Sequence, residues 1–285
     1  MKIFVAGGNG FLGQVLVQKL QLQGYKAISV HSKECDLSEA NALDHLYAAS
    51  PDYIFHLAGK TGIASSWELP APFYQNNVDT TRTLLEYCRQ CKIPMHYVSA
   101  YIYGNQGSSS ISETVPAKPN NPYAHSKWMA EEMCHFYAHY FAVPVTISRP
   151  FNIYGPMQPS YFFISRMIHQ LRTQETIQTL SLSSKRDYVF VEDVAEALIA
   201  IMLRGKAGEC YNIGTGVCFS CKEVIDLLQS LLSTNKPICS EGQTRPEEIL
   251  HAQADRNKIS RELGWHPKYS LEEGLIKCLA QMSIS

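Results

Sequence analysis

The chain lacks an excess of charge of either sign and lacks long hydrophobic runs. Its 25 Lys and Arg residues nearly balance 26 Asp and Glu residues, which gives a formal net charge of −1. No basic surplus indicates nucleic-acid binding, and no charge block indicates a tail. The apolar runs are short and interrupted, so no membrane span is predicted. Because Met1 leads directly into an apolar strand pattern, we expect no signal peptide and a cytoplasmic location.

The sequence also lacks the signs of a disulfide framework. Its nine cysteines are an odd number, and nothing indicates secretion. Two Cys-x-x-Cys pairs, Cys88/Cys91 and Cys218/Cys221, have a spacing that zinc sites use. The first pair falls within a helical pattern and the second opens a different helix, so nothing in the sequence brings the pairs together. We therefore predict buried or scattered thiols and no metal site.

A glycine-rich turn near the start is the most informative feature that the chain does have. An apolar strand pattern over 2–6 ends in Gly7-Gly8-Asn9-Gly10-Phe11-Leu12-Gly13, and a helical pattern follows. Gly7 allows a tight turn, and Gly10 lets the backbone approach a pyrophosphate at the helix N-terminus. Gly13 lets helix and strand pack closely. In this strand-to-helix context, the pattern indicates a dinucleotide-binding turn rather than an ordinary glycine-rich loop.

Strand and helix patterns alternate through the first half of the chain. Strands are expected at 2–6, 27–31, 53–57, 95–99 and 145–149, and helices at 10–23, 41–50, 74–91 and 123–141. This alternation predicts an α/β fold built on a Rossmann-type, doubly wound parallel sheet. Residues 32–35 are too few for a crossover helix, so the second crossover is expected to be short. The Ser-, Pro- and Asn-rich stretch 107–121 is predicted to be a mobile loop.

The pattern changes beyond Pro150, where a smaller C-terminal α/β substrate lobe is expected. Helices are predicted at about 162–174, 193–203, 220–232 and 255–264, and strands near 188–191 and 209–213. We expect residues 1–150 and about 193–215 to form the NAD(P)-binding domain. The substrate-binding lobe is then discontinuous, over 151–192 and 216–285, and the cleft between the two is the expected substrate site.

Tyr123 and Lys127 are four residues apart on a predicted helix, so their side chains share one face. A free tyrosine has a pKa near 10, and a nearby ammonium favours the phenolate, so we expect Lys127 to lower the pKa of Tyr123. Such a pair beside a nicotinamide suits carbonyl and alcohol chemistry. The spacing alone is also common on protein surfaces; its place downstream of a dinucleotide turn favours catalysis.

Further motifs carry a resemblance to a known family over almost the whole chain. They are His56-Leu57-Ala58-Gly59, Asn77-Val78, Ser99-Ala100-Tyr101-Ile102-Tyr103-Gly104, Arg149-Pro150-Phe151-Asn152-Ile153-Tyr154-Gly155-Pro156, Arg186-Asp187-Tyr188-Val189-Phe190-Val191-Glu192-Asp193-Val194, Asn212-Ile213-Gly214-Thr215-Gly216 and Gly264-Trp265-His266-Pro267. Together with the glycine turn, Tyr123 and Lys127, they resemble the extended short-chain dehydrogenase/reductases of the nucleotide-sugar branch. The resemblance implies a nicotinamide cofactor, a nucleotide-sugar substrate and a homodimer paired through helices 74–91 and 123–141.

The resemblance also assigns roles to individual residues. Ser99, Tyr123 and Lys127 are the expected catalytic residues; Ser99 hydrogen-bonds the reacting sugar oxygen, and Lys127 also holds the nicotinamide ribose. The expected substrate contacts are Ser99, Tyr101, Asn152, Arg186 and Arg245, although Arg245 also fits a solvated loop arginine. The expected cofactor contacts are Gly7, Gly10, Phe11, Leu12, Gly13, His31, Ser32, Lys33, Asp36, Leu37, Leu57, Ala58, Gly59, Asn77, Tyr123, Lys127 and Pro150.

Departures from the family pattern reduce the number of reactions that this chain is expected to catalyse. The 4,6-dehydratases carry an acid directly after the catalytic Ser or Thr, where this chain has Ala100 and Tyr101, so dehydration is disfavoured. The 3,5-epimerase/reductases carry a Cys two residues after the Ser and a His after Tyr-Gly-Pro, where this chain has Tyr101 and Met157. Reduction of a 4-keto sugar and 4-epimerisation through a transient ketone both remain open. A dinucleotide binder without catalysis is disfavoured, because Ser99, Tyr123 and Lys127 are all present.

The end of the second strand favours NADP(H), with NAD(H) as the open alternative. The position that carries an acidic residue in NAD-binding folds holds His31, Ser32 and Lys33 here. No carboxylate repels a 2′-phosphate, and Lys33 is placed to attract one. Since net reduction consumes NADPH, we expect a reductase of a nucleotide-linked 4-keto-6-deoxyhexose, with Tyr123 as proton donor. The segments 66–70 and 245–246 most resemble GDP-6-deoxy-4-keto-mannose reductases; a 4-epimerase with tightly bound NAD is the alternative.

Overall fold

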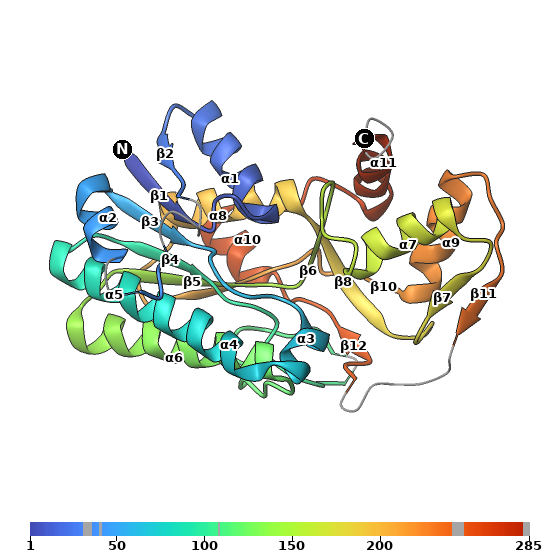
Figure 1. Cartoon of the computed structure of the whole chain (residues 1–285), viewed down its shortest axis with the longest axis horizontal. Coiled ribbons are helices and arrows are strands. Elements are labelled where there is room, and N and C mark those ends of the chain that lie inside the picture. Colours follow the sequence, from blue (N-terminus) through green and yellow to red (C-terminus); the bar gives the residue numbers. More distant parts are fainter. Residues whose placement is uncertain (31–35, 40–41, 108, 241–247, 282–285) are drawn as a thin grey trace.

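A six-stranded parallel sheet forms the centre of the larger part of the molecule (Figure 1). The computed structural model describes residues 1–285 except 31–35, 40–41, 108, 241–247 and 282–285. The sheet order is β2-β1-β3-β4-β5-β9. Its strands are β1 (Lys2–Ala6), β2 (Lys26–Ile28), β3 (Tyr53–His56), β4 (Met95–Val98), β5 (Val145–Pro150) and β9 (Cys210–Ile213).

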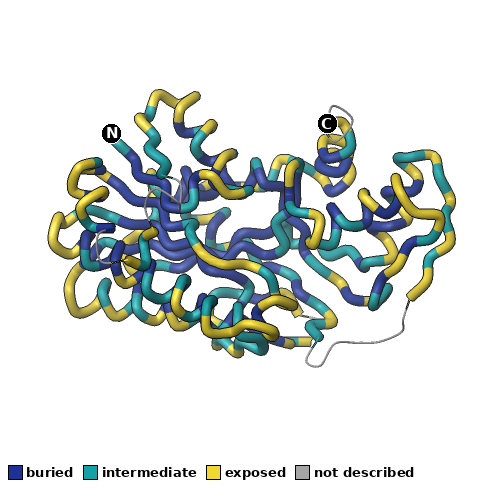
Figure 2. Tube along the Cα trace, viewed as in Figure 1, coloured by how far each residue is buried: buried dark blue, intermediate teal, exposed yellow. Residues whose placement is uncertain are grey.

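Helices cover both faces of this sheet, because side chains along each strand alternate between the faces. Ile3 and Val5 pack toward α1 (Phe11–Leu22), α8 (Val191–Arg204) and α10 (Asn257–Leu263). Phe4 and Ala6 pack toward the opposite layer, which contains α2 (Ala42–Ala49), α5 (Thr80–Cys91) and α6 (Pro122–Phe141). Figure 2 shows the strands buried between exposed outer helix faces. The Rossmann-type parallel sheet expected from the sequence is confirmed.

The order of strands reverses beside β1, which positions the ligand site. The chain leaves β1 for the edge strand β2, crosses back through α2 and enters β3 on the other side of β1. The helix α2 has 8 residues against 12 in α1. The short second crossover was predicted from residues 32–35, which lie outside the described residues. In open sheets of this kind, ligands bind outside the carboxyl ends of the strands at such a reversal.

A second group of short strands and helices lies at the right of Figure 1 and has its own hydrophobic core. The strand β8 (Lys185–Phe190) pairs with β6 (Asn152–Tyr154), β10 (Cys218–Ser220) and β12 (His251–Ala252), and β7 (Ile177–Thr179) pairs with β11 (Ile238–Ser240). The helices are α7 (Phe163–Thr173), α9 (Cys221–Leu231) and α11 (Leu271–Gln281). The exact division of the chain into two lobes stays a prediction.

The sequence patterns found the long elements within a few residues and missed the short ones. The predicted helix 74–91 is in fact α4 (Pro70–Tyr74), a π-helical turn (Gln75–Asp79) and α5, preceded by α3 (Ile63–Glu68). The prediction of a mobile loop at 107–121 is wrong for its described part. Ile111 is 1% exposed and bridges to Ala254, and the Glu113 carboxylate accepts a hydrogen bond from the Asn212 backbone at 2.7 Å.

None of the described helices has both the length and the apolar character needed to cross a membrane.

Candidate active site

The turn between β1 and α1 needs its glycines for steric reasons. Gly7 has a φ of +81°, and a Cβ added there would lie 2.7 Å from the Ala58 backbone nitrogen. A Cβ at Gly13 would lie 2.1 Å from the Gly7 carbonyl oxygen. Gly10 caps the N-terminus of α1, where free backbone N–H groups face outward. The turn therefore fits a dinucleotide pyrophosphate, as expected from the sequence.

Asn77 ties the loop after β3 to the helix that carries the predicted catalytic residues Tyr123 and Lys127. The residue is 1% exposed and lies in the π-helical turn, a feature that often marks functional sites. Its Oδ1 accepts from the Lys60 backbone N–H at 2.7 Å, and its Nδ2 donates to the Ser126 hydroxyl at 2.9 Å and the Lys60 carbonyl at 3.3 Å. A Cβ added to Gly59 would lie 2.8 Å from this Oδ1. Asn77 thus holds the 57–60 loop against α6.

The three predicted catalytic residues come from two elements. Ser99 directly follows β4, and Tyr123 and Lys127 lie in the first two turns of α6, whose N-terminus is capped by the Asn121 side chain. The Ser99 hydroxyl is buried and meets no hydrogen-bond partner among the described residues. The Lys127 ammonium lies 4.3 Å from the centre of the Tyr97 ring. Ser99 thus lies at the carboxyl end of the sheet, where the site was expected.

Burial decides the protonation of both members of the Tyr–Lys pair. It lowers the pKa of Lys127 to about 7, against the opposing effects of Cys134 and Glu131. Burial, and to a lesser degree the Tyr161 phenol, raises the pKa of Tyr123 to about 12. The expectation that Lys127 lowers the Tyr123 pKa is therefore wrong for the chain by itself. Removal from water disfavours the charged form of each group.

The other predicted cofactor residues lie in several places. Leu57, Ala58 and Gly59 follow β3 and Pro150 ends β5, so they lie at the same edge of the sheet as the glycine turn. Asp36 binds the backbone N–H and hydroxyl of Ser38 at 2.9 and 2.7 Å, and Leu37 and Leu12 pack against the two cores. Phe11 begins α1. The predicted cofactor residues His31, Ser32 and Lys33 lie outside the described residues. The predicted substrate residue Arg245 lies outside them too.

The predicted substrate residues that the structure describes lie where the sheet meets the second group of strands. The Tyr101 hydroxyl donates to the Gly104 carbonyl at 2.7 Å. Asn152 and Arg186 come from the paired strands β6 and β8, and the Asn152 amide donates to the Asp187 carbonyl at 3.3 Å. Burial raises the pKa of Tyr101, and the nearby Arg186 charge opposes this. The structure therefore brings Tyr101 and Arg186 to one place.

Sequence reasoning missed the role of Asp187, which organises this junction. Its carboxylate is fully buried and accepts hydrogen bonds from the Thr215 backbone, the Thr215 hydroxyl, and the Gly216 and Ala254 backbones, at 2.8, 2.7, 2.9 and 3.1 Å. It thereby joins β8 to two loops distant in sequence. The sequence did contain a signal, because Asp187 is a charged residue directly before the apolar end of its strand.

A buried ion pair between α6 and β5 was also missed. Glu131 is 0% exposed, and the Arg149 Nε donates to its Oε1 at 3.0 Å. The Arg149 Nη1 contacts the Tyr103 hydroxyl at 2.9 Å, and Tyr103 donates to Asn212 at 2.6 Å. Glu131 follows Lys127 by four residues on α6, a spacing that places the two on one face and could have indicated it.

Comparisons with known proteins agree with this geometry. The NAD dependent epimerase/dehydratase family profile matches residues 3–214. GDP-6-deoxy-D-mannose reductase of Pseudomonas aeruginosa is 28% identical over 96% of this chain and 94% of that protein. The dTDP-glucose 4,6-dehydratase of Xanthomonas campestris pv. campestris is 26% identical over 95% and 90%.

Solved structures give the same result. RMD from Pseudomonas aeruginosa, complexed with NADPH, superposes with a TM-score of 0.90 at 27% identity and covers 98% of both chains. UDP-glucose 4-epimerase from Thermotoga maritima, with UDP-glucose, superposes with a TM-score of 0.92 at 27% identity, over 100% of this chain and 99% of that one. Reductase, dehydratase and epimerase are thus similar to about the same degree, which supports a nicotinamide-dependent sugar-nucleotide enzyme. The chain belongs to the NAD dependent epimerase/dehydratase family.

Proposed function

We propose that the protein is an NADPH-dependent reductase of a nucleotide-linked 4-keto-6-deoxyhexose. The residues directly after Ser99 carry this proposal, because Ala100 and Tyr101 provide no acid for dehydration. Burial raises the pKa of Tyr123 to about 12, and its phenol is the proposed proton donor. Reduction of a ketone needs a proton donor at this point, whereas epimerisation begins with a base that takes a proton from the sugar hydroxyl.

The residues after Ser99 support reduction over dehydration. Ala100 is buried and carries no titratable group. The Tyr101 hydroxyl is engaged with the Gly104 carbonyl, and burial raises its pKa. Neither residue can move protons at the sugar carbons next to the ketone, so dehydration lacks the acid that it needs.

In the proposed mechanism, bound NADPH supplies the hydride. The glycine turn holds the pyrophosphate, Leu57, Ala58 and Gly59 line the cofactor, and Lys127 holds the nicotinamide ribose. Ser99 hydrogen-bonds the substrate carbonyl, and Tyr123 donates its phenolic proton to the carbonyl oxygen.

Two further assignments belong to the proposal. NADPH is preferred because His31, Ser32 and Lys33 include no carboxylate, and the similar RMD structure contains NADPH. Asn152, Arg186 and Arg245 bind the substrate diphosphate. We also propose a cytoplasmic homodimer formed through α5 and α6, where Met129, Phe136, Tyr140 and Phe141 are exposed on α6.

Nicotinamide absorbance tests the proposal directly. The enzyme is mixed with NADPH, or separately NADH, and a GDP- or dTDP-4-keto-6-deoxyhexose, and stoichiometric loss of NADPH is expected. Tyr123→Phe should lower turnover by about 10²- to 10⁴-fold, whereas Tyr140→Phe, at an exposed position of the same helix, should not. Two outcomes contradict the proposal: near wild-type turnover by Tyr123→Phe, or no cofactor loss together with tightly bound NAD and interconversion of two sugar nucleotides. The second outcome identifies a 4-epimerase.

A further inference from the structure

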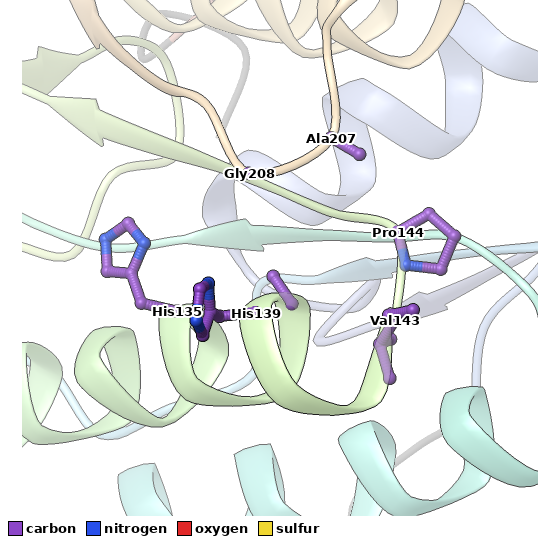
Figure 3. A pocket seen from close by; sticks show the side chains of 8 residues that line it. His135, His139, Val143, Pro144, Ala207 and Gly208 are labelled. Atoms are coloured by element: carbon purple, nitrogen blue, oxygen red, sulfur yellow. The ribbon is translucent and has the colours of Figure 1, made fainter.

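A pocket of about 660 Å³ opens at the far end of α6, away from the candidate active site. Its lining includes His135 and His139 on α6, which Figure 3 shows with Gly208 across from them. It also includes Pro144, directly before β5. The rise of 1.5 Å per residue places His139 about 24 Å from Tyr123 along the helix. This pocket therefore lies at the amino ends of the strands, and further substrate contacts are to be sought at the opposite edge of the sheet.

The segment 155–162, which links β6 to α7, contacts two parts of the candidate active site. At its start, a Cβ added to Gly155 would lie 3.3 Å from the Phe11 ring, where α1 begins. Near its end, the Tyr161 hydroxyl lies 3.4 Å from the Thr61 hydroxyl, in the loop after β3. The segment therefore reaches from the glycine turn to the loop that follows the next strand of the sheet.

The loop that Tyr161 contacts is close to the predicted catalytic residues. A Cβ added to Gly59, two residues before Thr61, would lie 3.9 Å from the Lys127 Nζ. The Tyr161 phenol is also near enough to Tyr123 to raise the pKa of Tyr123, although burial has the larger effect. Tyr161 therefore stands beside the proposed proton donor, on a segment of the second group of strands and helices.

The segment is anchored, whereas the Tyr161 side chain is accessible. Gln158 is 7% exposed, and its amide donates to the Ile153 carbonyl at 2.7 Å. The rings of Tyr161 and Phe162 pack with their centroids 4.6 Å apart. Tyr161 itself is 59% exposed. The fold thus holds this ring in place and leaves it open to a ligand.

The contact between the Tyr161 and Thr61 hydroxyls is easily exchanged. Its 3.4 Å is longer than the usual O–H···O distance of about 2.7–2.8 Å. A phenol both donates and accepts a hydrogen bond, so Tyr161 can turn to a substrate hydroxyl. Thr61 is exposed, and water then satisfies its hydroxyl.

On the basis of the reductase function proposed above, we propose that Tyr161 binds the hydroxyl on C3 of the keto sugar. Tyr123 is the proposed proton donor to the oxygen on C4, and Tyr161 lies beside it. In a 4-keto-6-deoxyhexose, C3 carries the one hydroxyl next to the carbonyl, whereas C5 carries the ring oxygen and a methyl group. Tyr161 is thus a substrate-binding residue that selects sugars with a hydroxyl at C3 and fixes the carbonyl against Tyr123.

A cycle of two enzymes and two substrates tests this assignment. The wild type and Tyr161→Phe are each given the nucleotide-linked 4-keto-6-deoxyhexose and its 3-deoxy counterpart, and NADPH absorbance gives kcat/KM. In the wild type, loss of the C3 hydroxyl should lower kcat/KM about tenfold, because one hydrogen bond is lost. In Tyr161→Phe, kcat/KM with the first substrate should fall by a similar factor, and the loss of the C3 hydroxyl should have little further effect.

Two control variants separate the sugar contact from other roles. Tyr47→Phe removes the hydroxyl of another exposed tyrosine, which contacts the Gln90 side chain, and should keep the dependence on the C3 hydroxyl. Thr61→Val removes the partner that Tyr161 has in this structure and should keep that dependence too. Fluorescence titration should show NADPH binding within about twofold of the wild type in Tyr161→Phe.

The outcomes distinguish the failure of either proposal. If the wild type does not oxidise NADPH with the keto sugar, the reductase function fails and the role of Tyr161 fails with it. If oxidation occurs and Tyr161→Phe keeps the wild-type dependence on the C3 hydroxyl, the role of Tyr161 alone is refuted. It is also refuted if Thr61→Val loses that dependence to the same extent, since Tyr161 would then act by holding the loop.

Discussion

Replacing Lys127 by methionine should stabilise the cofactor-free protein at neutral and acid pH. Lys127 is 5% exposed, and burial lowers its pKa from 10.5 to about 7. Each pH unit between the folded and unfolded pKa corresponds to about 1.4 kcal/mol, so the buried ammonium costs about 3–5 kcal/mol below pH 7. Methionine keeps an unbranched side chain of similar length and carries no charge, so it avoids this cost.

The sign of the pH dependence follows from proton binding. Between about pH 7 and pH 10.5, the unfolded chain holds the lysine proton more tightly than the folded chain does, so wild-type stability gains about 1.4 kcal/mol per pH unit from this group. The advantage of Lys127→Met is therefore full below pH 7 and disappears as the pH approaches 10.5. Below pH 7 both states are protonated, and the difference no longer changes.

Urea unfolding at several pH values from about 6 to 9.5 measures this difference. Lys26→Met, at an exposed position of the edge strand β2, is the control and should show little change at any pH. A Lys127→Met advantage that stays constant across this range would mean that Lys127 has an ordinary pKa. That result would refute the reasoning, and with it the view that burial governs the catalytic pair.

Three further predictions follow from the site geometry. Gly13→Ala places a Cβ against backbone atoms that cannot move aside, so it should lower the melting temperature and weaken cofactor binding at least about tenfold in fluorescence titration; normal binding would contradict the close approach at this turn. Asn77→Ala removes three hydrogen bonds of a buried amide and should cost about 1–3 kcal/mol in urea unfolding, while Gln75→Ala, exposed in the same turn, should cost little. Asp187→Asn replaces an acceptor of four hydrogen bonds with a group that also donates, and should cost about 3 kcal/mol or more. Its control, Asp226→Asn on the exposed face of α9, should stay within about 0.5 kcal/mol of the wild type, and equal effects of the two would contradict the role given to Asp187.

The glycine turn and the long elements were predictable because their requirements are local. Gly7 has a left-handed backbone conformation. A Cβ at Gly10 or Gly13 would come close to the Gly7 carbonyl oxygen in the same turn. The strand β1 and the helix α6 are long enough to show their periodicity. The four-residue spacing of Tyr123 and Lys127 placed both on one helix face without any knowledge of the fold.

The short strands could not be predicted in the same way. β6, β10 and β12 have two or three residues each, too few to show an alternating pattern, and they exist because they pair with β8. The anchoring of Ile111 against Ala254 joins residues far apart in sequence. Composition alone made this segment look like a mobile loop, since Ser, Pro and Asn describe turns but not the contacts that fix them.

The sequence by itself determined the family, the dinucleotide turn and the identity of the Ser–Tyr–Lys set, because each depends on residue type and short spacing. Only the tertiary structure decided the protonation of Tyr123 and Lys127, the anchoring by Asp187 and the ion pair between Glu131 and Arg149. The reason is physical. A pKa depends on how much water surrounds the group, and a buried hydrogen-bond network depends on strands and helices brought together from distant parts of the chain.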